Sequence, residues 1–216
     1  MSEIDNSTSE AAEKRILDKA ESLVLNEGPQ SMKMDDLATA LGMSKKTLYI
    51  HFPGKEAIIK AIISRIASHL SASLKKLVED ETIPFPAKLE KLHDIIASRL
   101  TRLRPSLLRD LERNYPECYQ YFDQMRNRNI PLVLGTLLRE GKMSGHVRAE
   151  VNPDFAALAW LHMMRGLTQS SVAEALKMNL HEILDSALLT FFRGVLTEKG
   201  QVEFDAIAKR KGMSGK

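Results

Sequence analysis

Cysteine is nearly absent from this sequence of 216 residues, in which Cys118 is the only one. A single cysteine cannot form a disulfide within one chain, and we expect an inert, partly buried thiol. The six histidines include no pair four residues apart, and there is no Cys-x-x-Cys motif. These are common zinc-ligand patterns, so we predict neither a metal site nor a cofactor.

Catalytic motifs and long apolar runs are missing as well. The sequence contains no glycine-rich phosphate loop, no G-x-S-x-G elbow and no nucleophile with a paired base, so nothing in it supports an enzyme. The first ten residues, MSEIDNSTSE, are polar and acidic, unlike a signal peptide. No uninterrupted apolar run approaches the roughly 18 residues of a membrane span. We therefore expect a cytoplasmic protein with no membrane partner.

Helical periodicity runs through nearly the whole chain. With 44% hydrophobic and 27% charged residues, the sequence can bury a sizeable core. No Val/Ile/Thr alternation bounded by turn residues appears, so we predict an all-α fold without strands. Prolines mark helix starts or breaks. The predicted helices span 13–26, 34–41, 45–51, 55–78, 87–103, 106–113, 117–128, 131–142, 153–176 and 180–198.

The segment 28–58 has the pattern of two short helices joined by a tight turn. Apolar residues at three-to-four spacing predict a helix over 34–41, and Gly42 suits its left-handed C-cap. Ser44 can cap a second helix over 45–51. Helices joined by so short a turn cross steeply, which allows the second one to enter a DNA major groove.

The second of these helices has two distinct faces. Lys45, Lys46 and Tyr49 fall within about 100° of arc, while Leu48 and Phe52 point toward a core. The net charge of +3 for the chain is weak evidence for nucleic acid, and residues 1–60 carry eight basic against ten acidic residues. Locally, however, 44–60 holds four lysines against Glu56, which gives +3 where phosphates would be met.

This segment resembles the tetracycline-repressor (TetR) family of bacterial transcription regulators. The family pattern I-A-x-x-x-G-v-S-x-x-T-L-Y-x-H-F-x-x-K-E is matched at fixed spacing, and the preceding helix matches the I-L-x-x-A-x-x-L part of the family's first helix, with Arg15 directly before it. Lys33 stands where the family prefers a capping Thr or Ser, and Lys46 stands where Gly is common. The matching residues are Arg15-Ile16-Leu17, Ala20, Leu23, Gly28, Leu37-Ala38, Leu41-Gly42, Ser44, Thr47-Leu48-Tyr49, His51-Phe52 and Lys55-Glu56.

The resemblance implies an N-terminal three-helix DNA-binding domain with a helix-turn-helix, followed by a C-terminal helical domain for ligand binding and dimerisation. On this basis we expect a disordered tail over 1–10, a DNA-binding domain over 11–55 and a linking helix over 55–78. An effector-binding and dimerisation domain would occupy 79–200, and a C-terminal tail 201–216. The expected DNA contacts are Ser44, Lys45, Lys46, Thr47 and Tyr49 in the groove, with Lys33, His51 and Lys55 on phosphate.

Dimerisation and effector binding are also implied. In the family the last two helices form a four-helix bundle with a second subunit, and a small, largely apolar effector lies between helices of the C-terminal domain. A single short recognition helix contacts few base pairs, so affinity also requires a homodimer. The expected interface is Leu184, Ala187, Leu188, Phe191 and Val195, and the expected pocket is Arg104, Tyr115, Tyr119, Phe122, Trp160, Met163 and Met164.

The sequence thus predicts a ligand-responsive transcriptional regulator that acts as a repressor. It would bind a palindromic operator as a homodimer. Two alternatives stay open. One is a DNA-bound adaptor of the same fold that needs no small effector. The other is an all-helical scaffold that does not bind DNA. Retarded migration of promoter DNA separates the regulator from the scaffold, and ligand-dependent release from DNA separates it from the adaptor.

Overall fold

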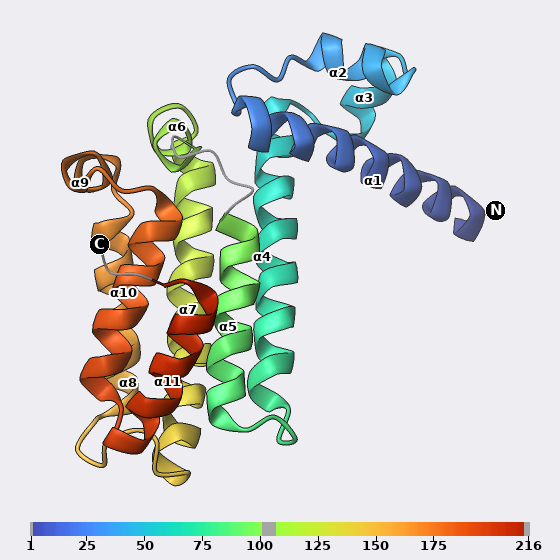
Figure 1. The fold of residues 1–216 in the computed structure, drawn as a ribbon. Helices are drawn as coiled ribbons and strands as arrows, with labels where there is room; N and C mark the ends of the chain where they lie inside the picture. The colour runs from blue at the N-terminus through green and yellow to red at the C-terminus, as the bar shows by residue number, and fades with distance from the viewer. Residues whose placement is uncertain (1, 101–106, 214–216) are drawn as a thin grey trace. The chain divides into compact units, whose positions relative to one another are not determined.

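The structure is a computed structural model, and it describes residues 2–100 and 107–213. Over these residues the chain forms eleven helices and no β-strand, apart from one isolated antiparallel bridge between Val147 and Leu196 (Figure 1). The all-α prediction is confirmed. The helices are α1 (Ser2–Glu27), α2 (Met34–Leu41), α3 (Lys45–His51), α4 (Lys55–Glu79), α5 (Phe85–Leu100), α6 (Leu107–Asn114), α7 (Pro116–Met143), α8 (Pro153–Leu167), α9 (Ser170–Leu176), α10 (Leu180–Val195) and α11 (Glu198–Lys211).

The described residues divide into two compact units. Unit 1 consists of 2–68 and 107–122, and unit 2 of 69–100 and 123–213. Helices α4 and α7 therefore each begin in unit 1 and end in unit 2. The expected domain boundaries treat 79–200 as one C-terminal domain, but α6 and the first two turns of α7 belong to the N-terminal unit.

Unit 1 is built around a core shared by its helices. Ile16 of α1, Leu37 of α2, Leu48 of α3 and Ile58 of α4 are all fully buried. Leu111 of α6 and Cys118 of α7 belong to the same cluster. Burying side chains of this size removes apolar surface from water, which stabilises the fold by about 25 cal/mol per Å². The packing of α1, α4 and the α6–α7 region thus holds α2 and α3 in place.

Unit 2 has its own core, formed by the later parts of α4 and α7 with α5, α8, α10 and α11. Leu137 and Leu138 of α7 and Leu184 of α10 are almost fully buried. Lys88 of α5 is also buried, and its ammonium donates to the Val78 carbonyl at 3.0 Å and to the Glu140 carboxylate at 2.6 Å. The charge of Lys88 is therefore paired, as burial of an ammonium requires.

Three boundaries before the C-terminal residues differ from the sequence prediction. The sequence predicts a break at Pro131, but α7 continues through it. Proline removes one helical hydrogen bond at a cost of about 3 kcal/mol or more, and burial of Leu134, Leu137 and Leu138 just beyond it offsets that cost. The predicted helix 153–176 is divided at Thr168, whose hydroxyl donates to the Met164 carbonyl at 2.7 Å. The predicted disordered tail 1–10 is helical from Ser2.

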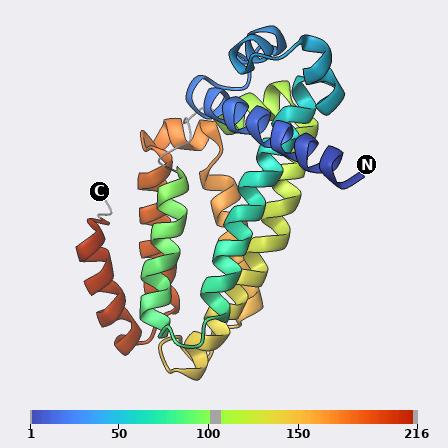
Figure 2. The ribbon, with the colours of Figure 1, turned by 90° about the vertical axis from the view of Figure 1, so that its right-hand side faces the viewer.

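The C-terminal residues are the largest departure. A tail is predicted over 201–216, but α11 occupies most of it, and Figure 2 shows α11 alongside α5 and α10. Thr197 caps α11 by accepting from the Gly200 amide, and Phe204 and Ile207 are buried. A Cβ on Gly200 would lie 2.4 Å from the His146 carbonyl oxygen, so only glycine permits this close approach.

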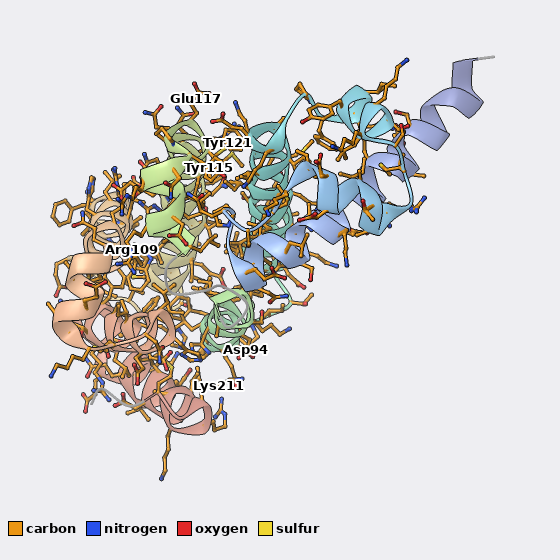
Figure 3. All side chains as sticks on the ribbon, turned by 90° about the horizontal axis from the view of Figure 1, so that it is seen from above. Asp94, Arg109, Tyr115, Glu117, Tyr121 and Lys211 are labelled. Carbon is orange, nitrogen blue, oxygen red and sulfur yellow. The ribbon has the colours of Figure 1, made fainter. Side chains whose placement is uncertain are left out.

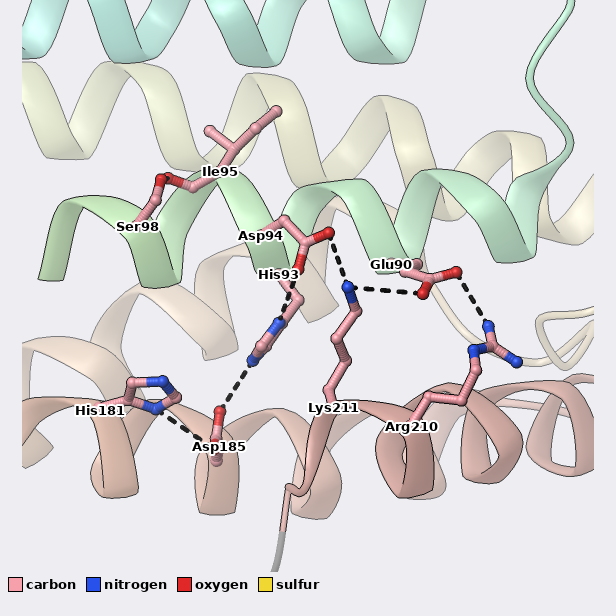
Figure 4. Close-up of polar contacts among 9 residues, drawn as sticks. All are labelled: Glu90, His93, Asp94, Ile95, Ser98, His181, Asp185, Arg210 and Lys211. Atoms are coloured by element: carbon pink, nitrogen blue, oxygen red, sulfur yellow. Dashed lines mark hydrogen bonds and ion pairs between the residues drawn. The ribbon is translucent and has the colours of Figure 1, made fainter. Parts of the chain in front are cut away.

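Ion pairs fasten α11 to α5, as the close-up in Figure 4 shows. Arg210 donates to Glu90 at 2.9 Å, and Lys211 donates to Asp94 at 2.8 Å. The hydrogen bond from Arg210 lowers the pKa of Glu90. Partial burial raises the pKa of Asp94, but the hydrogen bond and charge of Lys211 outweigh it, so the net shift is downward. The pKa of Lys211 is raised, chiefly by its hydrogen bond to Asp94.

Beneath these surface pairs lies a buried carboxylate between two histidines. Asp185 of α10 is 3.0 Å from His93 Nε2 of α5 and 3.3 Å from His181 Nδ1 (Figure 4). His93 and Asp185 are both less than a tenth exposed. The buried carboxyl group of Asp185 therefore has hydrogen-bonding partners, and its contact with His93 joins α5 to α10.

One described helix, α4, is long and apolar enough to cross a membrane by length and composition alone. Counting uninterrupted apolar runs in the sequence does not reveal it. The match is weak evidence because core helices of soluble proteins have the same length and composition. Ile58, Ile59 and Ile62 of α4 are buried in the core of unit 1, which accounts for part of its apolar composition.

Candidate nucleic-acid interface

The turn between α2 and α3 forms as its sequence predicts. Gly42 lies in the left-handed region at φ 65°, and its amide bonds back to the end of α2. Ser44 has an extended backbone, and its hydroxyl accepts from the Thr47 amide at 3.0 Å. The glycine lets the chain leave α2 without a Cβ clash, and the serine satisfies one of the free amides at the start of α3. The helix-turn-helix is thus fixed by local chemistry.

Helix α3 is anchored on one side and open on the other. Leu48 is fully buried and Phe52 is 7% exposed, whereas Tyr49 is 48% exposed. The predicted rotation of the helix, with Leu48 and Phe52 in the core, is confirmed. Lys45, Lys46 and Thr47 are exposed together with Tyr49. This exposed face carries ammonium groups, a hydroxyl and a phenol ring, which are groups that contact phosphates and base edges.

Two residues in this region have environments that the sequence does not predict. Ile50 is 73% exposed on α3, although an apolar residue there would ordinarily be assigned to a core. It follows Lys46 by four positions, and that spacing on a helix could have placed it beside Lys46 on the open face. Arg15 of α1 donates to the Leu41 carbonyl at 3.2 Å, at the end of α2. No local pattern reveals this contact, because it joins residues 26 positions apart.

The charged residues expected at this face differ in how they are held. The Lys45 ammonium lies 2.6 Å from the Asp35 carboxylate, and both side chains are 61% exposed. Lys33 occupies the N-cap position of α2 without making a side-chain cap, and it is exposed. Lys45 therefore has an acidic neighbour within its own unit, which a phosphate would have to displace or share.

His51 and Lys55 have partners within unit 1. His51 Nδ1 lies 3.6 Å from Glu13 Oε1 of α1, and the imidazole is only 11% exposed. The Lys55 ammonium donates to the Gln30 carbonyl at 2.9 Å and lies 5.8 Å from the centre of the Tyr115 ring. The imidazole is thus directed toward α1. The Lys55 ammonium keeps further N–H donors, because it has three.

The residues expected to line an effector pocket fall into two groups. Tyr115, Tyr119 and Phe122 pack against the core of unit 1, not that of the expected effector domain. Trp160, Met163 and Met164 belong to or pack against the core of unit 2. Arg104 lies outside the described residues. Trp160 is 7% exposed and its ring centre lies 5.1 Å from that of Phe191, so it serves as a core aromatic in this chain.

The expected dimer residues need a correction. Leu184, Ala187 and Leu188 are at most 3% exposed and lie in the core of unit 2, so they are covered within one chain. Phe191 and Val195 are partly buried against the same core. The broad apolar stripe of α10 arises because α10 packs on several helices of its own unit. Phe155 and Leu158 of α8 are exposed apolar residues in this part of the chain, at 73% and 47%.

The comparisons of sequence agree on the family. Residues 16–62 match the family model described as bacterial regulatory proteins, tetR family. The uncharacterized transcriptional regulator YvaF of Bacillus subtilis is 24% identical over 187 residues, which cover 87% of this chain and 97% of YvaF. EthR of Mycobacterium tuberculosis is 34% identical over 65 residues, 30% of each chain. The nucleoid occlusion factor SlmA of Aliivibrio fischeri is 31% identical over 130 residues, which cover 57% of this chain and 66% of SlmA.

Solved structures share the fold. The reduced form of NemR from E. coli superimposes with a TM-score of 0.66 at 16% identity, covering 86% of this chain and 96% of NemR. The complex of SmeT with triclosan superimposes with a TM-score of 0.57 at 16% identity, covering 87% and 93%. Together with the exposed cationic face of α3, the matches in sequence identify the chain as a member of the TetR family, a transcriptional regulator with a DNA-binding helix-turn-helix.

Proposed function

We propose that the protein is a cytoplasmic, ligand-responsive repressor that binds a palindromic operator as a homodimer through α3. The observation that carries this proposal is the division of α3 into a buried side, with Leu48, and an open side with Lys45, Lys46 and Tyr49. These three side chains and Thr47 reach into the major groove, and Ser44 lies at the start of the same face. Lys33 and Lys55 contact phosphate. His51, which faces Glu13, serves inside unit 1 instead.

The test replaces Lys45 and Lys46 with alanine together. Operator affinity should fall, and the dependence of log affinity on log salt should flatten by about one unit for each phosphate that is no longer neutralised. The helical circular dichroism spectrum should stay unchanged, because both side chains are exposed. The operator can be selected from fragments of the source genome with the wild-type protein. An unchanged affinity across salt concentrations would remove α3 from the role of reading helix.

Dimerisation supports this function because two recognition helices must reach successive major grooves, about 34–36 Å apart. We propose the outward face of α8, with Phe155 and Leu158, as the centre of the interface. We include Val195, at the end of α10, in this interface. Its carbonyl accepts from the Arg148 amide at 3.0 Å, and Arg148 lies shortly before the start of α8. Exposed large apolar side chains at one end of a unit favour a protein contact there.

An effector site in unit 2 completes the proposal. Its lining would come from the side chains that pack around α8, with Trp160, Met163 and Met164 as the apolar part. A hundredfold loss of operator affinity on ligand binding requires about 2.7 kcal/mol of coupling, and operator DNA must then weaken ligand binding by the same factor. Titration of apolar ligands with and without operator, followed by Trp160 fluorescence, measures this coupling. Equal ligand affinity in both titrations would exclude induction by that ligand.

The similarity to a nucleoid occlusion factor favours a second candidate function, a DNA-bound adaptor without a small effector. The two candidates differ in one measurement. An adaptor would bind its DNA equally well in the presence of every ligand in a broad apolar set, whereas the repressor would be released by at least one.

A further inference from the structure

The ammonium of Lys55, at the first position of α4, is held on two sides. Its Nζ donates to the Gln30 carbonyl at 2.9 Å, and the Tyr115 ring centre lies 5.8 Å away. A cation at this distance from an aromatic ring is attracted by the ring's electron-rich face. Tyr115, labelled in Figure 3, stands between α6 and α7. Its amide donates to the Leu111 carbonyl at 2.8 Å. The ring therefore comes from a segment far along the chain from Lys55.

A second contact between a lysine and a tyrosine ring joins α4 to α7. The Lys60 ammonium lies 5.7 Å from the centre of the Tyr121 ring, and the Tyr121 hydroxyl donates to Ser64 Oγ at 3.0 Å. Between them Cys118 is fully buried, with its Sγ 3.7 Å from the Glu56 carbonyl. Burial raises the pKa of the Cys118 thiol, with the charge of Glu56 adding to the effect, which suits a packing role. The first turns of α7 are thus fastened to the first turns of α4 within unit 1.

We propose that Tyr115 is a positioning residue for DNA binding, because it holds the Lys55 ammonium ready for a phosphate oxygen. The inference rests on the proposed function in taking Lys55 as a phosphate contact. An ammonium has three N–H donors. The Gln30 carbonyl accepts one and the ring covers one side, which leaves a donor for phosphate. A side chain already held in place loses less conformational freedom when the complex forms, and the affinity gains by that difference.

The same contact connects Lys55 to the rest of the chain. Helix α7 is continuous from Pro116 to Met143, and it contributes Cys118 to the core of unit 1 and Leu134 and Leu137 to that of unit 2. A displacement of the start of α7 withdraws the Tyr115 ring and leaves Lys55 less ordered.

A double-mutant cycle tests the inference with short duplex DNA as the probe, since phosphate contacts do not require the operator sequence. Tyr115→Leu should weaken binding by about two- to tenfold, the range expected when one long side chain is no longer ordered in advance. In the Lys55→Met background the same change should have no effect. Lys55→Met alone should lower the salt slope by about one unit, because one phosphate is no longer neutralised. Tyr115→Phe keeps the ring and should bind like the wild type.

Amine labelling of the folded wild-type protein reports directly how well the Lys55 ammonium is held. Lys55 should react more slowly than the exposed Lys46, and Tyr115→Leu should reduce the difference without abolishing it, because the Gln30 carbonyl still accepts from Lys55. Equal labelling rates in the wild type would overturn the inference, also in the case where Tyr115→Leu fails to fold. An equal loss of affinity from Tyr115→Leu in both backgrounds, or no loss in either, would overturn it as well. Absence of DNA binding by the wild type would instead contradict the proposed function.

Discussion

Leu48 and Tyr49 are neighbours in α3 with opposite environments, the first fully buried and the second about half exposed. Leu48→Ala should lower the free energy of unfolding by about 2–5 kcal/mol, because it leaves a cavity in the core of unit 1. Tyr49→Ala should change stability little and weaken operator binding. Urea unfolding and DNA titration of both variants measure the two effects. A stable Leu48→Ala together with an early-melting Tyr49→Ala would mean that α3 is rotated about its axis, with Tyr49 in the core.

The ion pair between Asp35 and Lys45 places a carboxylate beside the proposed DNA-reading face of α3. Asp35→Asn should tighten binding to duplex DNA at low salt, because it removes a negative charge and releases Lys45 for phosphate. The gain should shrink as salt screens the charges. Stability should change by less than about 1 kcal/mol, since exposed ion pairs contribute little.

Asp36→Asn is the matched control for this change. Asp36 lies in the same first turn of α2, so replacing it removes the same net charge and the same favourable interaction with the helix dipole. A tighter complex from Asp35→Asn than from Asp36→Asn identifies the ion pair with Lys45 as the cause. Weaker DNA binding by Asp35→Asn would show that the carboxylate positions Lys45 and does not compete for it.

At this scale the sequence is informative where the relevant partner is local. The C-cap at Gly42, the N-cap at Ser44 and the burial of Leu48 all follow from residues within one or two turns. The partner of His51 does not, because Glu13 reaches it only once α1 packs on the helix-turn-helix. The same holds for Tyr115 and Lys55, which come from different helical segments of unit 1.

Whole elements are predicted best where caps and apolar spacing agree. Asn152 accepts from the amides of Asp154 and Phe155, and with Pro153 it starts α8 as expected. The break predicted at Pro131 is wrong because tertiary packing supports a helix that local propensity would interrupt. Helix α11 is not predicted because its polar residues outnumber its apolar ones, although Thr197 caps its start and Gly212 its end.

The attachment of α11 to α5 should depend on pH. Glu90 and Asp94 have lowered pKa values in the folded chain, so their contribution to stability is present above their unfolded pKa, near 4, and is lost as pH falls through the folded values. The raised pKa of Lys211 affects stability at the alkaline end of the pH range. Its contribution is complete below the ordinary value of 10.5 and is lost as pH rises through the folded one.

A variant with Glu90→Gln and Asp94→Asn tests this attachment. It should unfold more easily than the wild type near neutral pH, and the difference should shrink toward zero as the pH falls through the lowered folded pKa values of Glu90 and Asp94, where the carboxylates become protonated in both states. Urea unfolding at several pH values, followed by circular dichroism, gives the comparison. A difference that is constant from neutral to acidic pH would assign the loss to packing instead of charge.

For the whole molecule, the sequence predicts an N-terminal helix-turn-helix and an all-helical remainder, but the compact units divide the chain elsewhere than expected. The segment 107–122 follows α5 in sequence and yet packs with α1 and α4, through Leu107, Leu111 and Cys118. Its apolar spacing predicts helices that bury one face. The spacing does not identify the helices against which that face packs. Three residues expected in an effector pocket therefore belong to the DNA-binding unit, namely Tyr115, Tyr119 and Phe122.

The buried residues of α10 cannot be used to test how two copies assemble. Leu188 is 3% exposed within one chain, so Leu188→Asp would bury a charge in the core of unit 2 and unfold it, which says nothing about dimerisation. Phe155 is 73% exposed in the first turn of α8. An aspartate there faces solvent in a monomer and interacts favourably with the start of the helix, so the fold should tolerate it.

Phe155→Asp should therefore produce a folded monomer if α8 forms the dimer interface, because association would desolvate the new charge. Light scattering should report a halved mass relative to the wild type, and operator affinity should fall because one recognition helix is left to bind alone. Val202→Asp is the control, since Val202 is a similarly exposed apolar residue, at 67%, on α11. A dimer that persists in Phe155→Asp and dissociates in Val202→Asp would move the interface from α8 to α11. A wild-type monomer at micromolar concentration would contradict the homodimer itself.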